Sequence, residues 1–446
     1  MRRTPISSSP TGKGRLILPP AQAPAEYRIL DLRSVIELLR PLNDVRTMLG
    51  GRPEDWHIRE VGDGNLNLVF IVEGPEGSAC VKQAVPYVRA AGPSWPMSLE
   101  RAFFENSYYR AVAPYVGARI PRLYHYDAEL YCTVMERLTP HIILRHGLIA
   151  GRRYPNLARD IGEYVARACF FTSDFAWPFE RKMDSSALFS GNKALVRITV
   201  DLIFTDPYLV SDRNRHTSPQ LDEMVRDLRR DGPLKVAAAA FGQKFLEQRQ
   251  ALIHGDLHSG SVMVTENDTR VIDPEFAFYG PIGFDLGAFF GNLLLSWYSQ
   301  PGHATASDDR RAFRDWILDQ ARLFWETFRC RFLALCADQA RGDLFPAAMF
   351  SAPQDHAALE SARRAYVDAL FADMLGFGAC KMIRRILGFA HVIDFDSISD
   401  AALRAGCEGN ALAMAHLLLT HPKQFHSVDA VIDAVPRVVS QDHGFI

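Results

Sequence analysis

Two aspartates and a glutamate, placed around a pair of short predicted strands, form the pattern in this sequence with the clearest chemical meaning. Asp256 lies in an HGDLH run, and Asp273 and Glu275 lie in an IDPE run. Between them, residues 262–265 and 270–273 are typical of two strands joined by a polar turn. If these strands pair as a hairpin, their outer ends meet, and Asp256 then lies close to Asp273 although the two are distant in sequence.

This arrangement of carboxylates suits phosphoryl transfer. In an extended stretch, Asp273 and Glu275 face the same way, so we expect them to converge with Asp256 on one point. Close carboxylates repel unless a cation joins them, and Mg²⁺ binds one or two carboxylates together with phosphate oxygens. We therefore expect Asp273 and Glu275 to hold Mg²⁺, and Asp256 to orient a substrate hydroxyl and accept its proton. The alternative is that Asp256 caps a turn and the other two are solvated; their hairpin spacing favours the catalytic interpretation.

A glycine-containing turn earlier in the chain is typical of a phosphate-binding loop. It is a GDGNLN run between predicted strands at residues 57–61 and 66–72. Glycines let backbone N–H groups approach phosphate oxygens closely. The third glycine of a full GxGxxG motif is missing, so an ordinary hairpin turn is the alternative. The residues that we expect to bind nucleotide here are Gly62, Asp63, Gly64, Asn65 and Asn67.

Lys82 lies on the next predicted strand, residues 79–85. A lysine at this position reaches the α- and β-phosphates of a nucleotide and pairs with a glutamate on a neighbouring helix. Glu105, in a helix predicted over residues 99–115, is the expected partner, and Glu100 is the alternative. An isolated lysine on a strand would be interpreted as simply exposed; its position after the glycine-containing turn favours the phosphate role.

A third nucleotide contact is expected where an apolar strand, residues 130–135, runs into a charged connector. Backbone groups near Glu136 and Leu138 would contact the edge of the adenine base in this hypothesis. An ordinary strand end is an equally good interpretation of this pattern. We place the boundary between two lobes in the same segment, with a hinge near residues 136–140.

The chain is rich in strands first and in helices later, which predicts an α+β fold with two lobes. We expect a disordered extension over residues 1–25, a smaller lobe with the nucleotide-binding turn over residues 26–138, and a helical lobe with the catalytic and substrate sites over residues 139–446. Residues 86–97 contain three prolines and Trp95 and predict a long loop, a common form of lid. Aromatic and aliphatic residues at helical spacing over residues 311–335 predict a buried helix face.

A first helix is predicted over residues 32–39, with Asp31 at its N-cap.

The composition of the chain excludes several classes of partner. The formal net charge of −2 over 446 residues gives no electrostatic reason to expect a nucleic acid or an anionic membrane as partner. Seven scattered cysteines without a CxxC pair suggest reduced thiols in a cytoplasm. The most apolar run, near residues 288–295, is too short to span a membrane, and the N-terminus lacks the apolar core of a signal peptide.

The order of these motifs resembles the aminoglycoside phosphotransferase and choline kinase branch of the kinase-like superfamily. Longer runs are similar to the 5-methylthioribose kinase family in particular. These runs are HGDLHSGS at 254–261, DPEFAFYGPIGFD at 273–285, GDGNLNLVF at 62–70, FTDP at 204–207 and KMIRRI at 381–386. Many kinases carry an asparagine metal ligand five residues after the catalytic aspartate. Ser261 occupies that position in this chain, as in the resembling family, so we expect Asp273 and Glu275 to bind Mg²⁺.

The resemblance implies a protein-kinase-like fold with an antiparallel sheet in the N-lobe, a mostly helical C-lobe and ATP bound between them. It implies phosphorylation of 5-methylthioribose at the O1 hydroxyl, giving the 1-phosphate in methionine salvage, and it suggests a homodimer. It assigns catalysis to Asp256, metal binding to Asp273 and Glu275, and contacts with the sugar to Arg384, Arg385 and Trp95. From the residues alone, the two arginines would be a salt-bridging pair on a helix. Alternatives are a kinase of this fold for an aminoglycoside, choline or homoserine, and a nucleotide-binding module without catalysis.

Overall fold

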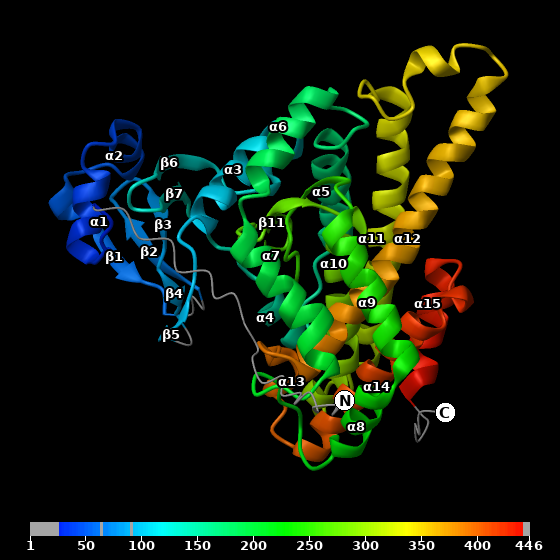
Figure 1. Ribbon diagram of the computed structural model, residues 1–446. Helices are drawn as coiled ribbons and strands as arrows, with labels where there is room; N and C mark the ends of the chain where they lie inside the picture. The colour runs from blue at the N-terminus through cyan, green and yellow to red at the C-terminus, as the bar shows by residue number, and fades with distance from the viewer. Residues whose placement is uncertain (1–25, 63–65, 90–91, 440–446) are drawn as a thin grey trace, which may run out of the picture.

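The computed structural model describes residues 26–62, 66–89 and 92–439. A smaller lobe built on a β-sheet stands beside a larger helical lobe, as the α+β pattern predicts (Figure 1). The predicted N-terminal extension lies outside the described residues. None of the described helices is both long and apolar enough to cross a membrane.

The smaller lobe contains a five-stranded antiparallel sheet in the order β1-β2-β3-β7-β6. Its strands are β1 (His57–Glu60), β2 (Asn67–Glu73), β3 (Ser78–Ala84), β6 (Leu123–Asp127) and β7 (Cys132–Glu136). The strands predicted from alternation are therefore confirmed within one or two residues. Val72, Val81 and Val134 point to one buried face, which α1 (Leu32–Leu39) and α2 (Asn43–Leu49) cover. Asp31 caps α1 as predicted, since its carboxylate accepts a hydrogen bond from the backbone N–H of Ser34 at 2.7 Å.

The segment expected to be an irregular loop, residues 86–97, is instead a two-stranded hairpin. Its strands are β4 (Tyr87–Val88) and β5 (Gly92–Pro96), paired antiparallel. Gly92 enters β5 with φ of +71°, a conformation that glycine adopts without steric cost. The pairing was not predicted because the prolines and the glycine in this segment are typical of a loop. The next helix, α3 (Arg101–Val116), follows the hairpin directly.

The connector between the lobes leads from β7 to a small sheet that carries the segment predicted to be catalytic. This sheet has the order β11-β10-β8, with β8 (Ile142–Ile143), β10 (Val262–Val264) and β11 (Thr269–Val271). The predicted hairpin is confirmed, because β10 pairs antiparallel with β11 and Val262 lies opposite Val271. A second small sheet pairs β9 (Ala251–Ile253) with β12 (Phe278–Gly280). The boundary expected near residue 138 falls in the connector, and it stays a prediction.

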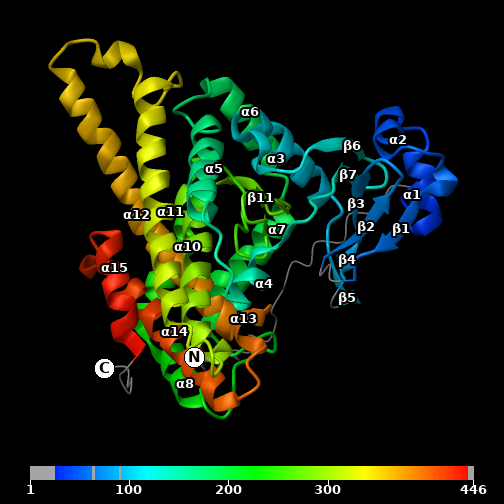
Figure 2. The same cartoon turned by 180° about the vertical axis from the view of Figure 1, so that it is seen from behind.

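Helices make up most of the larger lobe (Figure 2). They are α4 (Leu144–Ile149), α5 (Leu157–Phe171), α6 (Phe179–Phe189), α7 (Lys193–Thr199), α8 (Asp222–Arg230), α9 (Gly232–Glu247), α10 (Ile282–Ser299), α11 (Arg311–Asp338), α12 (Asp355–Leu387), α13 (Ile393–Asp396), α14 (Ala401–Thr420) and α15 (Val428–Ala434). All residues of α10 are buried, and α12 packs along it. Gly287 permits this packing, because a Cβ there would lie 2.5 Å from the backbone N of Gly378. The predicted buried face of α11 is confirmed at Phe313, Ile317, Phe324, Phe328 and Phe332.

Candidate active site

The segment between β9 and β10 forms a tight turn that presents Asp256. Gly255 has φ of +82°, and a Cβ there would lie 2.2 Å from the backbone oxygen of Phe276, so only glycine fits. The buried carboxylate of Asp285, on α10, accepts hydrogen bonds from the backbone N–H groups of His254 and Gly255 at 2.6 and 3.0 Å. The turn that carries Asp256 is therefore fixed from two sides by the helical lobe.

The carboxylate of Asp256 is surrounded by nitrogen donors. The ammonium group of Lys381, on α12, lies 2.6 Å from Oδ1, and Nε2 of His258 lies 3.2 Å from Oδ2. Nη2 of Arg385 is 3.8 Å from Oδ2. The Asp256 side chain keeps 21% of its surface exposed, so a small molecule can still reach it. The hydroxyl of Ser261 donates to the backbone oxygen of Asp256 at 2.9 Å, which shapes the turn.

Hydrogen bonds define the tautomer of His258. The backbone N–H of Gly260 donates to Nδ1 at 2.8 Å, so Nδ1 carries no proton. Burial, with Arg385 and Arg145 nearby, lowers the pKa of His258 to about 3 despite the attraction of Asp256. The ring is therefore neutral near pH 7, and its single N–H, at Nε2, points to Oδ2 of Asp256.

These neighbours keep Asp256 ionised. Burial alone would raise the pKa of its carboxyl, but the charge of Lys381, the hydrogen bond from His258 and the charge of Arg385 outweigh burial. The pKa of Asp256 is held well below its ordinary value. At neutral pH this carboxylate is ionised and can accept a hydrogen bond from a hydroxyl group.

Lys82, on β3, forms the second charged group of the site. Its ammonium group lies 2.8 Å from Oε1 of Glu105, on α3, and also contacts the carboxylate of Asp273. Glu105 is thus the partner that was expected, and the alternative, Glu100, is an exposed residue just before α3. Burial would lower the pKa of Lys82, but Asp273, Glu105 and Glu275 together raise it well above its ordinary value. Lys82 is a fixed cation between the two lobes.

Glu275 and Asp273 have different partners, and the extended stretch that was expected to join them is absent. Asp273 has φ of +70°, so the stretch is not extended at this residue. Oε2 of Glu275 accepts a hydrogen bond from the side-chain amide of Asn67 at 3.0 Å and lies 3.3 Å from Nε of Arg101. Its other oxygen, Oε1, is buried without a hydrogen-bond partner. A buried carboxylate oxygen without a partner can coordinate a metal ion or accept a hydrogen bond from a water molecule.

The expected convergence of three carboxylates on one point is therefore wrong in its detail. Asp256 pairs with Lys381, Asp273 with Lys82, and Glu275 with Arg101. Across residues 26–62, 66–89 and 92–439, no group of three His, Cys, Asp or Glu side chains is placed to hold a metal ion by itself. Each carboxylate instead has its own cation.

The remaining residues expected to bind nucleotide are only partly placed. Asp63, Gly64 and Asn65 lie outside the described residues, and Gly62 is exposed with open space around its Cα. Asn67 is buried between Arg101 and Glu275, so it positions Glu275 rather than facing a ligand freely.

Glu136 and Leu138 lie at the start of the connector. Oε2 of Glu136 accepts a hydrogen bond from the backbone N–H of Arg122 at 3.0 Å and lies 3.4 Å from Arg270, on β11. The Glu136 side chain thus links the sheet of the smaller lobe to the β10–β11 hairpin. Leu138 is half-buried, and the expected contact of their backbone with adenine stays a prediction.

Arg384 and Arg385 lie at the C-terminal end of α12, on the same side as Lys381. Nη1 of Arg385 donates to the backbone oxygen of Ala390 at 3.2 Å. Nε and Nη1 of Arg384 are buried and have no hydrogen-bond partner among the described residues. The pKa of Arg384 is lowered, because burial outweighs the opposing attraction of Asp256. Unpartnered donors of this kind are suited to an oxygen-rich ligand.

Trp95 reaches from the β4–β5 hairpin to the helical lobe. Its ring lies 4.8 Å from that of Phe389, centroid to centroid, and the guanidinium of Arg213 lies 6.0 Å from the Trp95 ring. Phe389 lies two residues after the end of α12 and four residues after Arg385. The hairpin therefore lies over the end of α12 that carries the two arginines, which is where a lid on the acceptor would be needed.

Sequence reasoning gave no role to Lys381, His258, Arg101 or Phe389. A signal for Lys381 was present, because positions i, i+3 and i+4 share one helix face, and these positions are Lys381, Arg384 and Arg385. His258 lies two residues after Asp256 in the same turn. The contact of Arg101 with Glu275 joins residues far apart in the chain and has no local signal.

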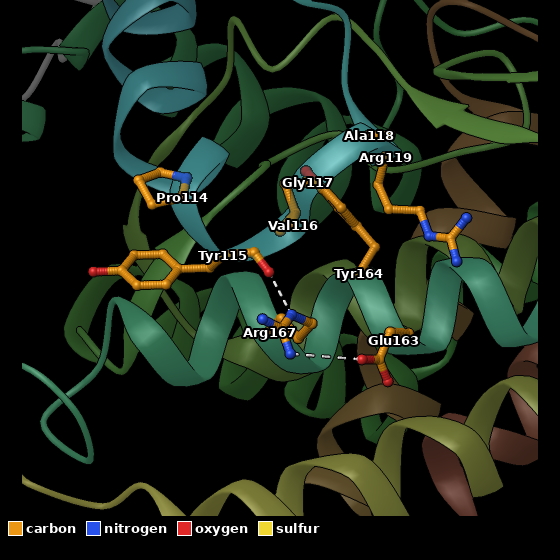
Figure 3. A pocket seen from close by; sticks show the side chains of 9 residues that line it. All are labelled: Pro114, Tyr115, Val116, Gly117, Ala118, Arg119, Glu163, Tyr164 and Arg167. Atoms are coloured by element: carbon orange, nitrogen blue, oxygen red, sulfur yellow. Dashed lines mark hydrogen bonds and ion pairs between the residues drawn. The ribbon is translucent and has the colours of Figure 1, made fainter.

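A separate hollow of about 480 Å³ lies away from these residues, where the end of α3 meets α5 (Figure 3). Its cations are already paired: Arg119 lies 2.7 Å from Asp160, and Arg167 lies 3.8 Å from Glu163 and donates to the backbone oxygen of Tyr115. It contains none of the residues expected to act in catalysis.

The fold and site define a phosphotransferase with a kinase-like architecture. In agreement with this, residues 57–324, more than half of the chain, match the model of the phosphotransferase enzyme family. This match includes Lys82, Asp256, Asp273 and Glu275.

Curated relatives narrow the class. The chain is 46% identical to "Methylthioribose kinase" of Escherichia coli O45:K1 over 387 residues, which are 86% of this chain and 92% of that protein. It is 43% identical to "Methylthioribose kinase 1" of Oryza sativa subsp. japonica, over 91% of this chain and 94% of that protein. It is 40% identical to "Methylthioribose kinase" of Yersinia pseudotuberculosis serotype O:3, over 84% of this chain and 88% of that protein. The chain belongs to the methylthioribose kinase family.

Proposed function

We propose that this chain transfers the γ-phosphoryl group of ATP to the O1 hydroxyl of 5-methylthioribose, giving 5-methylthioribose 1-phosphate in methionine salvage. The observation that carries the proposal is the carboxylate of Asp256, ionised and partly exposed, next to Arg385. The names of relatives that align over most of the chain supply the acceptor.

On the nucleotide side, Lys82 is a fixed cation that binds the α- and β-phosphates, with its position set by Glu105. Asp273, 43% exposed, and the unpartnered Oε1 of Glu275 are the groups that would hold Mg²⁺. A bound Mg²⁺ would neutralise charge on the phosphate oxygens. Residues of the glycine-containing run at 62–67 would donate backbone N–H groups to the phosphates.

On the acceptor side, Asp256 accepts a hydrogen bond from the O1 hydroxyl and directs this oxygen at the γ-phosphorus. The O1 proton passes to the Asp256 carboxylate as the new O–P bond forms. The bond between the γ-phosphorus and the bridging oxygen breaks, and ADP leaves with that oxygen's negative charge. Arg384 and Arg385 bind sugar hydroxyls or the transferred phosphoryl oxygens, which suits the fork of donors that a guanidinium presents.

The test is incubation of the purified protein with ATP, Mg²⁺ and methylthioribose, followed by ³¹P NMR for a sugar 1-phosphate and by a coupled assay for ADP. Parallel reactions with choline, an aminoglycoside and homoserine compare the other acceptors. Release of ADP with methylthioribose and formation of the 1-phosphate are expected. Faster turnover with any of the other acceptors would assign the chain a different substrate. ATP binding without phosphoryl transfer to any of the four acceptors would contradict the proposal, and would support a nucleotide-binding module instead.

A further inference from the structure

Lys381 is a buried lysine that contacts the catalytic carboxylate from a distant part of the chain. Only 2% of its side chain is exposed, and its ammonium group lies 2.6 Å from Oδ1 of Asp256. The same group lies 4.6 Å from the centroid of the Phe284 ring, on α10, so its surroundings are partly aromatic. Burying an ammonium group in such surroundings is costly unless it is paired.

We propose that Lys381 is a positioning residue for phosphoryl transfer: it fixes Oδ1 of Asp256, so that the carboxylate stays anionic and presents Oδ2 to the acceptor hydroxyl. This inference rests on the proposed function, because it takes Asp256 as the group that receives the hydroxyl proton. A carboxylate oxygen can accept two hydrogen bonds, so Oδ2 still accepts one from an acceptor while His258 donates to it.

The charges around Lys381 differ from those around an ordinary structural ion pair. A lysine in a structural ion pair normally gains from its partner. Here burial outweighs the attraction of Asp256, and the neighbouring Arg384 and Arg385 add repulsion, so the pKa of Lys381 falls to about 8. Perturbed pKa values cluster at functional sites, and the buried 2.6 Å contact of Lys381 with Asp256 is the geometry on which the inference rests.

A second lysine–aspartate pair, which joins α9 to α12, provides a comparison. Lys244, on α9, contacts Asp373, which is buried on α12 two turns before Lys381. The Lys244 side chain is 42% exposed, and this pair contains none of the proposed site residues. It has the same chemistry as the Lys381–Asp256 pair without the proposed role.

Lys381 keeps its proton throughout the proposed reaction. The hydroxyl proton moves to Asp256, and no bond to Lys381 is made or broken. Before transfer, the ammonium group restricts rotation of the carboxylate about its Cβ–Cγ bond. Without it, the carboxylate would be free to turn toward Arg385, and the acceptor hydroxyl would lose its alignment with the γ-phosphorus.

The test compares Lys381→Met and Lys381→Arg with the control Lys244→Met, in the full-length protein with ATP, Mg²⁺ and methylthioribose. Methionine keeps the length of the side chain without its charge, and arginine restores the charge. We expect Lys381→Met to lower kcat about 100-fold, the size of effect typical of a misaligned reacting group, with the KM for ATP unchanged. Lys381→Arg should recover part of this loss. Lys244→Met should keep the wild-type kcat, although its unfolding temperature falls.

Three outcomes would overturn the inference. One is a kcat of Lys381→Met equal to that of the wild type. Another is a rise in the KM for ATP with kcat unchanged. The third is the same loss of kcat in Lys244→Met at an equal drop in unfolding temperature. If Lys381→Met does not fold, Lys381→Arg decides, because an alkaline limb at the wild-type pH in that variant would exclude the role. A wild-type protein that does not phosphorylate methylthioribose would instead refute the proposed function, so the two failures are distinguishable.

Discussion

Lys82 on β3 and Glu105 on α3 form a buried ion pair, with Nζ 2.8 Å from Oε1, that ties the sheet of the smaller lobe to its helix. The Glu105 side chain is 3% exposed and that of Lys82 is 12% exposed, so the pair is largely shielded from water. The same ammonium group contacts Asp273 in the other lobe. One lysine thereby joins β3, α3 and the segment after β11, and its position depends on all three.

Replacing Glu105 with glutamine should weaken ATP binding. The amide cannot balance the charge of Lys82, and the ammonium group would then shift toward Asp273. The amide oxygen still accepts a hydrogen bond from Lys82, but loss of the charge weakens this bond by about 1 kcal/mol, which corresponds to a rise in the KM for ATP of roughly fivefold. Steady-state kinetics at saturating methylthioribose measures this rise. The control is Glu100→Gln, an exposed glutamate next to the same helix; equal KM values in both variants would show that the pair does not matter for ATP.

Asp256→Ala should abolish most turnover while ATP binding survives. The variant lacks the group that receives the hydroxyl proton, and groups of this kind contribute about 10²- to 10⁴-fold to rate. Lys82, Glu105 and Asp273 are untouched, so the Kd for ATP in a calorimetric titration should stay near that of the wild type. Near-normal turnover of this variant would rule out the catalytic assignment.

Glu275→Gln should raise the concentration of Mg²⁺ needed for activity. The amide keeps the shape of the side chain and an oxygen acceptor for Asn67 or Arg101, but it removes a negative charge from the group proposed to bind the metal. Loss of a carboxylate ligand should raise the half-activating Mg²⁺ concentration by at least about tenfold, the lower end of effects seen even for groups behind the ligands. Titration of activity with Mg²⁺ at fixed ATP measures it. An unchanged Mg²⁺ requirement would assign the metal to other groups.

The pH dependence of kcat/KM for methylthioribose should show a loss of activity on the alkaline side. The pKa of Lys381 is lowered to about 8 by burial, with Arg385 and Arg384 on its own helix opposing the attraction of Asp256. Asp285, on α10, is the further charged group that interacts with it. Because the protonated lysine is the form that holds Asp256, activity should be full below pH 7 and should fall as the pH rises through about 8.

On the acid side, His258 should produce no loss of activity near pH 6.5. Its pKa is lowered to about 3, so the ring does not change charge in this range. In Lys381→Arg the alkaline loss should move to higher pH, since arginine keeps its charge. An alkaline limb at the same pH in this variant would assign the limb to another group.

Much of the fold followed from the sequence, because it depends on local patterns. The strands of the smaller lobe show alternating apolar and polar residues, and α11 shows apolar residues at helical spacing. Both patterns are local in the sequence, so both elements could be predicted. The pairing of β10 with β11 followed from the turn between them. The β4–β5 hairpin did not, since its strands are short and contain proline and glycine, which signal a loop when read alone.

The site was predictable only where its residues lie close in sequence or in a motif. Asp256, Asp273 and the Lys82–Glu105 pair followed from motif order. The contacts of Lys381 with Asp256 and of Arg101 with Glu275 depend on how α12 and α3 pack, and no short-range pattern reports them. The stretch from Asp273 to Glu275 was predicted to be extended, but Asp273 has a positive φ. A left-handed residue changes the direction of the chain, and alternation of side chains along an extended stretch then no longer applies.

Trp95 and Phe389 should determine how well the enzyme holds the methylthio end of its acceptor. Their rings are 4.8 Å apart between the β4–β5 hairpin and the end of α12, next to the two arginines. An apolar thioether packs favourably against aromatic rings, by about 0.3–1.5 kcal/mol for each sulfur–aromatic contact. Phe389→Ala and Trp95→Ala should therefore raise the KM for methylthioribose by roughly 2- to 10-fold each, with the KM for ATP unchanged.

The same substitutions should matter less for ribose, which lacks the thioether. The ratio of kcat/KM for methylthioribose to that for ribose should therefore fall in both variants, because the lost contact belongs to the sulfur end of the acceptor. Phe179→Ala, which removes an exposed ring on α6 far from the hairpin in sequence, is the matched control and should leave this ratio unchanged. If kcat/KM falls equally for both acceptors in Trp95→Ala, the hairpin closes the site but does not discriminate between acceptors by the methylthio group. If neither acceptor is affected, the contact between Trp95 and Phe389 lies outside the path of the substrate.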